Sequence, residues 1–250
     1  MKITLMGAGG CIERAGSKFV ATMVECGDAI YFIDGGCSLA DGLLRLDKDP
    51  TRVRAVFVTH YHGDHTAGIF PFVDLVNWAW RDCKLKLIFP TRELIAATER
   101  MILASLSYGG KIDRERLNFV LAAAGRVYED EHIFVDYIPT KHFPNGGAPS
   151  YAILVTERAS GKRVLFSGDL SHGLVAQDLP REALRGCALF VCELYHFGIK
   201  ELVPYLDGFD GTLCIHHLFE RDEHRDELVS ELEAYVPRVI APENGGVVEI

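Results

Sequence analysis

Short apolar runs alternate with polar or glycine-containing turns along most of the chain, a pattern typical of strands joined by tight connections. The runs are of strand length and rich in branched and aromatic residues. Strands are expected at residues 2–6, 19–25, 29–33, 56–58, 85–89, 119–124, 133–139, 151–156, 163–166, 189–192, 213–215 and 239–240.

Four segments are instead interpreted as helices, and in the second of them Ile69, Phe72 and Val76 recur at near-helical spacing. Helices are expected at residues 39–46, 68–80, 92–106 and 223–235. Strands dominate each half of the chain and helices lie between them. We therefore expect an α/β protein with two sheets packed face to face and helices outside. No linker or repeat divides the sequence, so a single domain over residues 1–250 is expected.

Two polar segments between strands are interpreted as turns. The run Gly7-Ala8-Gly9-Gly10 lacks the spacing of a dinucleotide-binding fingerprint, and no clear helix follows it, so a tight turn is the better interpretation. The acidic run Glu129-Asp130-Glu131 is expected to be a solvated turn.

Composition narrows the class of protein. The chain of 250 residues has a formal charge of −9, which does not suit a general polyanion binder. Its seven cysteines are an odd number without a Cys-x-x-Cys pair, which favours reduced thiols in a cytoplasmic protein. No apolar run reaches the length of a membrane span, and the first residues resemble a strand rather than a signal peptide. No membrane partner is expected.

The densest group of metal-binding side chains follows the central strand. His60, His62, Asp64 and His65 fall within six residues of a chain that has ten histidines in all. His60 and His62 would share one side if the strand pleat continues, and Gly63 would let the backbone bend sharply. Imidazoles with a carboxylate suit zinc, and also manganese or iron.

Three later runs of strand type also end in a ligand-type side chain. The first ends in His142, the second in Asp169 and the third in the pair His216-His217. Upstream, Asp34 follows the strand expected at residues 29–33. Four distant segments thus offer metal ligands at strand ends.

The motif His-x-His-x-Asp-His at residues 60–65, with the later ligands in this order, resembles the metallo-β-lactamase superfamily over essentially the whole chain. The resemblance implies the four-layer αββα sandwich of that superfamily. It also implies two divalent cations, zinc in the first place, with manganese or iron as alternatives. Asp34 would fix a ligand histidine through its other ring nitrogen.

The resemblance assigns ligands to each cation. One would bind His60, His62 and His142, the other Asp64, His65 and the last histidine, with Asp169 as a bridge. Two divalent ions about 3.5–4 Å apart can hold a hydroxide between them, because they lower the pKa of water toward about 7. Asp64 would also orient this nucleophile or accept its proton.

The last histidine is either His216 or His217. In sequences resembling ribonuclease Z an arginine follows the ligand by four places, and Arg221 lies four after His217. Another superfamily pattern uses the first histidine of such a pair. We favour His217.

Glu193 and His196 follow the strand expected at residues 189–192. They would be catalytic if His196 supplied the acid for the leaving group. A Glu–His pair that only satisfies local hydrogen bonds explains the same residues equally well. His172, three residues after Asp169, is interpreted as a loop residue without a ligand role.

These residues favour hydrolysis of a small substrate. His62 stands where related diiron oxidoreductases have Glu, and the start of the chain resembles ribonuclease Z. However, only 26 residues separate His142 from Asp169, which leaves room for a hairpin but not for the long tRNA-binding arm of that family. We therefore expect a binuclear zinc hydrolase acting on a phosphodiester or related small phosphate ester, not on a long nucleic acid.

Two alternatives remain at this point. One is an acyl hydrolase of a lactone, thioester or β-lactam, which would need an oxyanion donor where a phosphate needs cationic or donor groups. The other is a metal-binding protein without turnover. Either an isolated chain or a homodimer agrees with the sequence.

Overall fold

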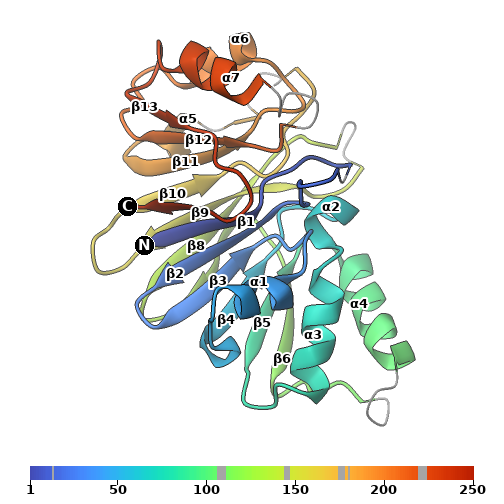
Figure 1. Cartoon of the computed structure of the whole chain (residues 1–250). Helices are drawn as coiled ribbons and strands as arrows, with labels where there is room; N and C mark the ends of the chain where they lie inside the picture. Colours follow the sequence, from blue (N-terminus) through green and yellow to red (C-terminus); the bar gives the residue numbers. More distant parts are fainter. Residues whose placement is uncertain (13, 106–110, 144–146, 174–177, 180, 219–223) are drawn as a thin grey trace.

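Two seven-stranded sheets lie face to face in the computed structural model (Figure 1). The structure describes residues 1–12, 14–105, 111–143, 147–173, 178–179, 181–218 and 224–250. The first sheet has the order β14 (Gly246–Glu249), β1 (Lys2–Gly7), β2 (Ala21–Cys26), β3 (Ala29–Ile33), β4 (Val53–Phe57), β5 (Leu85–Phe89) and β6 (Leu117–Leu121). The second has the order β13 (Arg238–Ile240), β12 (Thr212–His216), β11 (Cys187–Glu193), β10 (Arg163–Phe166), β9 (Tyr151–Glu157), β8 (Ile133–Pro139) and β7 (Gly125–Glu129).

Both sheets change from antiparallel to parallel pairing at the same place in their order. In the first sheet, β14 to β3 pair antiparallel and β3 to β6 pair parallel. In the second sheet, β7 to β10 pair antiparallel and β10 to β13 pair parallel. Because parallel strands end at one edge of a sheet, the loops after β3 and β4, and those after β10, β11 and β12, gather at these carboxyl ends.

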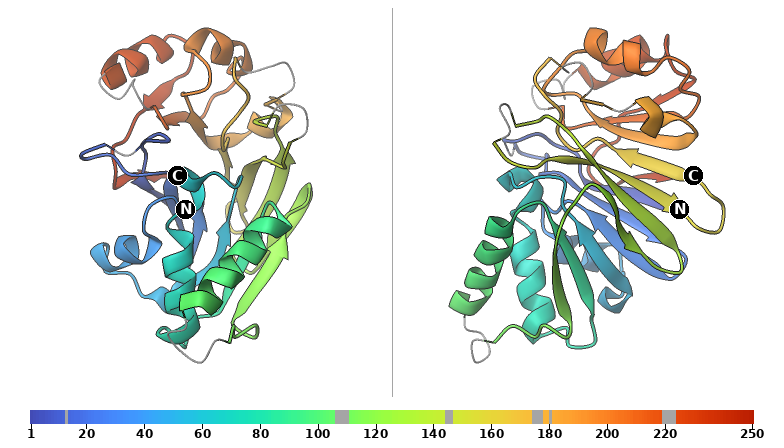
Figure 2. Two further views of the ribbon diagram at one scale, coloured as in Figure 1. Left: turned by 90° about the vertical axis from the view of Figure 1, so that its right-hand side faces the viewer. Right: turned by 180° about the vertical axis from the view of Figure 1, so that it is seen from behind.

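Helices cover the outer face of each sheet (Figures 1 and 2). Those on the first sheet are α1 (Leu39–Arg45), α3 (Ile69–Trp78) and α4 (Arg92–Ser105), with the short α2 (Gly63–Thr66) at its edge. Those on the second sheet are α5 (Arg181–Leu184), α6 (Ile199–Leu202) and α7 (Arg225–Leu232). Two 3₁₀ turns, Pro50–Arg52 and Val203–Tyr205, complete the described elements.

Three apolar layers hold these elements together. β3 shows the arrangement, because Tyr31 and Ile33 belong to the layer between the sheets while Ile30 and Phe32 pack under the helices of the first sheet. A strand buried on both faces is apolar throughout, as this one is. The expected α/β architecture, two sheets with helices outside, is confirmed.

The differences from the expected elements lie at edges and in short segments. The edge strands β7 and β14 were not expected, since glycine and charged residues interrupt their apolar pattern. α2, α5 and α6 are four residues each, too short to show a helical period. The glycine run at residues 7–10 opens a longer loop, closed by Gly9 N donating to Lys18 O, rather than a tight turn. The break expected at residues 108–110 and Arg221 lie outside the described residues.

Asp130 departs from the expected solvated turn. Its Oδ2 accepts hydrogen bonds from the hydroxyls of Tyr31 at 2.5 Å and Tyr128 at 2.8 Å. Its Oδ1 accepts from the backbone N–H groups of His132 and Ile133. Burial opposes ionisation, but these hydrogen bonds hold the pKa of Asp130 below its usual value. This carboxylate therefore ties β3 to the hairpin of the second sheet.

We expect Asp130→Asn to lower the free energy of unfolding by about 1–3 kcal/mol at pH 7, because buried donors lose their acceptor. A carboxylate with a depressed pKa stabilises the folded state above its unfolded pKa, and this contribution is lost as pH falls through the folded pKa. The difference between the two proteins should therefore shrink below about pH 4. Urea unfolding at pH 7 and pH 3 measures it, with the exposed neighbour Glu131→Gln as control. An equal difference at both pH values would contradict this account.

Candidate metal centre

The turn after β4 is held by the end of β3. β4 ends at Phe57, so His60 and His62 do not continue its pleat as expected. Asp34, directly after β3, accepts hydrogen bonds from Thr59 N and Thr59 Oγ1, each at 2.8 Å. Asp34 N in turn donates to Phe57 O at 2.8 Å. Hydrogen bonds from the end of β3 therefore fix where the turn after its parallel neighbour β4 begins.

Close backbone packing at this turn requires Gly36. A Cβ at Gly36 would lie 1.8 Å from the carbonyl oxygen of Asp64. Gly35 N donates to His65 O at 2.7 Å, so the two chain segments lie in direct contact. Gly63 begins α2, and a Cβ there would meet no atom within 4 Å. The glycine that this turn needs is therefore Gly36, and the role expected of Gly63 is wrong.

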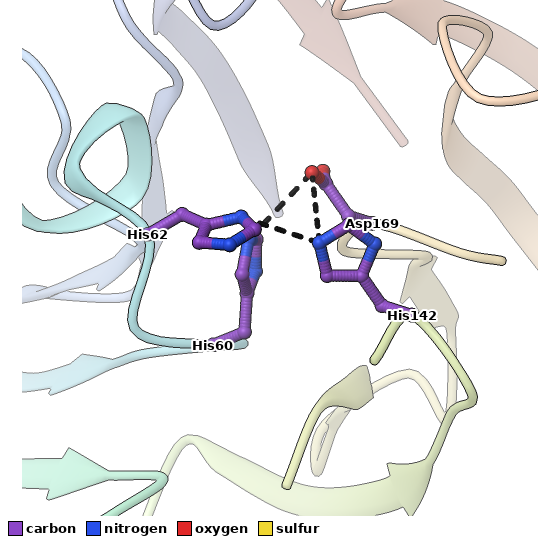
Figure 3. Close-up of side chains that lie close together, drawn as sticks. All are labelled: His60, His62, His142 and Asp169. Atoms are coloured by element: carbon purple, nitrogen blue, oxygen red, sulfur yellow. Dashed lines mark hydrogen bonds and ion pairs between the residues drawn. The ribbon is translucent and has the colours of Figure 1, made fainter. Parts of the chain in front are cut away.

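The first group of ligand-type side chains is His60, His62, His142 and Asp169, whose potential ligand atoms lie within 4.8 Å of one another (Figure 3). His142 Nε2 lies 3.2 Å from His62 Nδ1. Asp169 Oδ2 lies 3.6 Å from His60 Nε2 and 3.9 Å from His142 Nε2. Figure 3 shows the two histidines of the turn facing His142 and Asp169 on other loops. The distant segments meet as the sequence indicates.

The second group is Asp64, His65 and His217, also within 4.8 Å of one another. Asp64 Oδ2 lies 3.2 Å from His217 Nε2 and 3.8 Å from His65 Nε2. His65 Nδ1 hydrogen-bonds Asp34 Oδ2 at 2.8 Å. The expected contact of Asp34 with a site histidine is confirmed, and it directs His65 Nε2 toward the other members.

The structure places His216 and His217 in different surroundings. β12 ends at His216, and His217 then adopts a left-handed φ of 55° while its N–H donates to Ala8 O at 2.9 Å. This turn brings His217 to Asp64, whereas His216 belongs to neither group. Burial lowers the pKa of His216 to about 3. Of the two histidines, only His217 therefore joins Asp64 and His65 among the described residues.

Asp169 lies between the two groups. Its Oδ1 is 3.1 Å from His65 Nε2 and 3.9 Å from His217 Nε2, whereas Oδ2 faces His60 and His142. Each carboxylate oxygen is thus directed at a different set of histidines.

Several buried atoms of the site lack hydrogen bonds within the part of the chain that the structure describes. His60 Nε2, His65 Nε2 and Asp169 Oδ1 have no hydrogen-bond partner among the described residues, although the last two are close. Buried polar atoms are nearly always paired, so unpaired ones that converge require an explanation. Imidazole nitrogens and a carboxylate oxygen are the donors that zinc and similar divalent cations bind. The residues therefore fit a metal centre.

The buried histidines and carboxylates of the site shift one another's pKa values. Burial lowers the pKa of His60 well below its usual value, which leaves the imidazole neutral. Burial opposes protonation of His65 as well, but the carboxylates of Asp169 and Asp34 raise the pKa of His65 well above its usual value. Asp169 is stabilised as an anion despite its burial, because His217, His65 and His60 lower its pKa. Binding of a cation would displace the proton from His65.

Two supports of the site had not been expected. His142 Nδ1 lies 3.1 Å from Leu170 O, which turns Nε2 inward. Asp178, fully buried, accepts hydrogen bonds from Lys141 N and Ser171 N, both at 2.5 Å. It joins the loop of His142 to the loop that follows Asp169. No local pattern marks Asp178 in the sequence, since its partners are the backbone N–H groups of Lys141 and Ser171 rather than other side chains.

Glu193 and His196 border the metal centre. Glu193 is fully buried and its oxygens accept from Leu170 N, Tyr195 N and His196 N. Glu193 Oε1 also lies 2.8 Å from His196 Nδ1. His196 Nε2 is 3.9 Å from Asp169 Oδ2 and so faces the site. Burial opposes protonation, but the hydrogen bond and charge of Glu193 raise the pKa of His196. The ring of exposed His172 contacts the ring of His196 at 4.8 Å.

The chain that carries this centre is similar to known proteins. The family model described as anti-Pycsar protein Apyc1 matches residues 1–227. The chain belongs to the anti-Pycsar protein Apyc1 family. Ribonuclease Z of Methanocaldococcus jannaschii is 23% identical over 159 residues, 63% of this chain and 48% of that protein. Ribonuclease Z of Methanopyrus kandleri is 26% identical over 224 residues, 80% of this chain and 76% of that protein. The chain spans about half the length of most curated relatives that it matches.

Solved structures show the same fold. The metallo-β-lactamase fold protein YhfI of Bacillus subtilis superposes with a TM-score of 0.76 at 18% identity, covering 99% of both chains. The short form of human tRNase Z superposes with a TM-score of 0.76 at 16% identity, covering 100% of this chain and 99% of that one. The Apyc1-family chain is thus a ribonuclease Z-like member of the metallo-β-lactamase superfamily, and the expected four-layer αββα sandwich is confirmed. None of its described helices has the length and apolar character required to cross a bilayer.

Proposed function

We propose that the protein is a binuclear metal-dependent hydrolase with zinc as its metal and a small phosphodiester, or a related phosphate ester, as substrate. The observation that carries this proposal is the position of Asp169, whose two oxygens are directed at two separate groups of histidines. A single cation would need only one of these groups.

The proposed ligands follow from the two groups. His60, His62 and His142 would hold one cation, Asp64, His65 and His217 the other, and Asp169 would contact both. Two such cations would supply a nucleophile at neutral pH, by lowering the pKa of water toward about 7, and would neutralise charge on the ester. The nitrogen-rich ligand set supports zinc over the harder cations.

Acid–base roles would fall to residues at the border of the centre. Asp64 would accept a proton from the attacking water in addition to binding metal. His196 would donate the proton from Nε2 to the leaving oxygen, since Glu193 raises its pKa and orients the ring through Nδ1. Because the oxygens of Glu193 already accept several hydrogen bonds, we propose that Glu193 positions His196 and does not touch the substrate.

Two facts support a small phosphate ester. Ribonuclease Z relatives and a structural neighbour described as a diphosphatase of the PhnP family have names that denote cleavage of phosphate linkages. Between His142 and Asp169, the described chain contains only the hairpin of β9 and β10. We also propose a cytoplasmic location, which the odd number of cysteines without a Cys-x-x-Cys pair supports.

A substrate panel tests this function. Purified protein should contain two zinc ions per chain by mass spectrometry of metals, and should hydrolyse bis-p-nitrophenyl phosphate. It should hydrolyse thioester and lactone substrates much more slowly, and a chelator should abolish the activity. Faster cleavage of the acyl substrates would make it an acyl hydrolase. No turnover on any of them with both metals bound would overturn the enzyme proposal.

A further inference from the structure

Two cavities are each lined by a residue that contacts a proposed metal ligand, and their walls differ in chemistry. One has a volume of about 520 Å³ and includes Ala8, whose carbonyl accepts from His217 N. Its walls carry Arg14, Arg225, Asp226 and Glu243, so it suits a charged or strongly polar group.

The other cavity begins at the ligand turn itself. It has a volume of about 420 Å³, within the usual range of about 300–1,000 Å³ for small-molecule sites. Tyr61, which lies between His60 and His62 in the sequence, forms one wall. Leu94 and Ala97 of α4 form another. The cavity therefore adjoins the turn that carries the proposed ligands, since the ring of Tyr61 lies 5.4 Å from the ring of His62.

Aromatic rings connect this cavity to the metal centre. The ring of Tyr61 is stacked on that of Phe143, with centroids 4.8 Å apart and planes at 2°. Phe143 in turn contacts the rings of His62 at 5.0 Å and His142 at 4.7 Å. Phe143 holds Tyr61 from one side, and Tyr61 remains 42% exposed. Because the ring of Tyr61 is already held in place, stacking of a second ring on its exposed face should cost little conformational entropy.

We propose that this cavity is a subsite for a planar aromatic group of the substrate, and that Tyr61 determines specificity by stacking on that group. The inference rests on the proposed function, since the aromatic group is taken to be part of a phosphate ester bound at the metals. Glu93 lies at the cavity and disfavours a ring that carries its own negative charge. The subsite thus selects uncharged aromatic esters over alkyl esters.

Binding of two phosphonates tests the subsite without requiring turnover. Calorimetry on the zinc-loaded protein compares phenylphosphonate with methylphosphonate, which share the metal-binding group and differ in the ring. We expect the phenyl compound to bind about tenfold more tightly, the effect of one aromatic stacking contact. In Tyr61→Ala the two phosphonates should bind with about equal affinity, whereas Tyr61→Phe should retain the preference for the phenyl compound. Tyr235 is an exposed tyrosine after α7, and the control variant Tyr235→Ala should leave the preference unchanged.

A second variant removes the cavity without touching the ligand turn. Ala97→Trp fills it from α4 and should abolish the preference for the phenyl compound as Tyr61→Ala does. Metal content is measured for each variant, so that loss of zinc is not mistaken for loss of the subsite. Equal binding of both phosphonates by the unaltered protein, or a preference that survives both variants, would overturn the inference. Failure of the esterase panel with the phenyl preference intact would instead overturn only the proposed reaction.

Discussion

The variant His62→Ala is expected to lose one cation and nearly all hydrolytic activity. Changes to residues that merely orient a ligand lower metal affinity by about 10–100-fold, so removal of a proposed ligand should lower it more than about 100-fold. His62 is only partly buried, and its main contacts are with His60, Tyr61, His142 and Phe143. The fold should therefore persist, with a far-UV spectrum and an unfolding midpoint near those of the metal-free parent.

Zinc content and the rate of bis-p-nitrophenyl phosphate cleavage measure this effect. His224→Ala is the matched control, because His224 is exposed and pairs with Glu227 on α7. It should keep both cations and the parental rate. If His62→Ala retained two zinc ions and full activity, the assignment of the first group as a metal site would be wrong.

The second large effect is expected from His196→Gln, and it should depend on the leaving group. A general acid contributes about 10²–10⁴-fold when the leaving oxygen is a poor one, and far less when it leaves readily. Cleavage of phenyl diesters should therefore slow much more than cleavage of p-nitrophenyl diesters. The same loss on both substrates would remove His196 as the acid.

The pH profile separates donation of a proton from a structural role of His196. The acid form is required, so the rate with a phenyl diester should fall as pH rises through the pKa of His196. Glu193 raises that pKa, and Glu193→Gln should shift the alkaline limb to lower pH. In His196→Gln the limb should disappear. A limb that stays unchanged in both variants would show that another group titrates.

The proposed ligands at strand ends could be recognised in the sequence, because they follow the His-x-His-x-Asp-His motif in the order that the superfamily uses. Asp34 was expected to touch a site histidine, and it bonds His65 Nδ1 at 2.8 Å. The choice between His216 and His217 could not be made securely from sequence. It depends on a left-handed residue whose N–H pairs with Ala8, more than 200 positions away.

The supporting residues were harder to find because their partners are backbone groups of distant loops. Asp178 accepts from Lys141 N and Ser171 N, and nothing in its own neighbours indicates such contacts. Asp130 was interpreted as solvated because two further acids flank it, yet Tyr31 and Tyr128 donate to it across the sheets. Carboxylates that accept backbone or tyrosine donors leave no periodic pattern, unlike ligands at strand ends.

The two sheets contribute different halves of the proposed metal cage, and this has a consequence for folding. The turn at residues 60–65 follows the first sheet, whereas His142, Asp169 and His217 follow strands of the second. Cations bound there would act as cross-links between the amino-terminal and carboxy-terminal halves of the chain. Ligands that bind only the folded state stabilise it by mass action. The concentration of available metal would thus set the stability of the folded two-sheet structure as well as its catalytic activity.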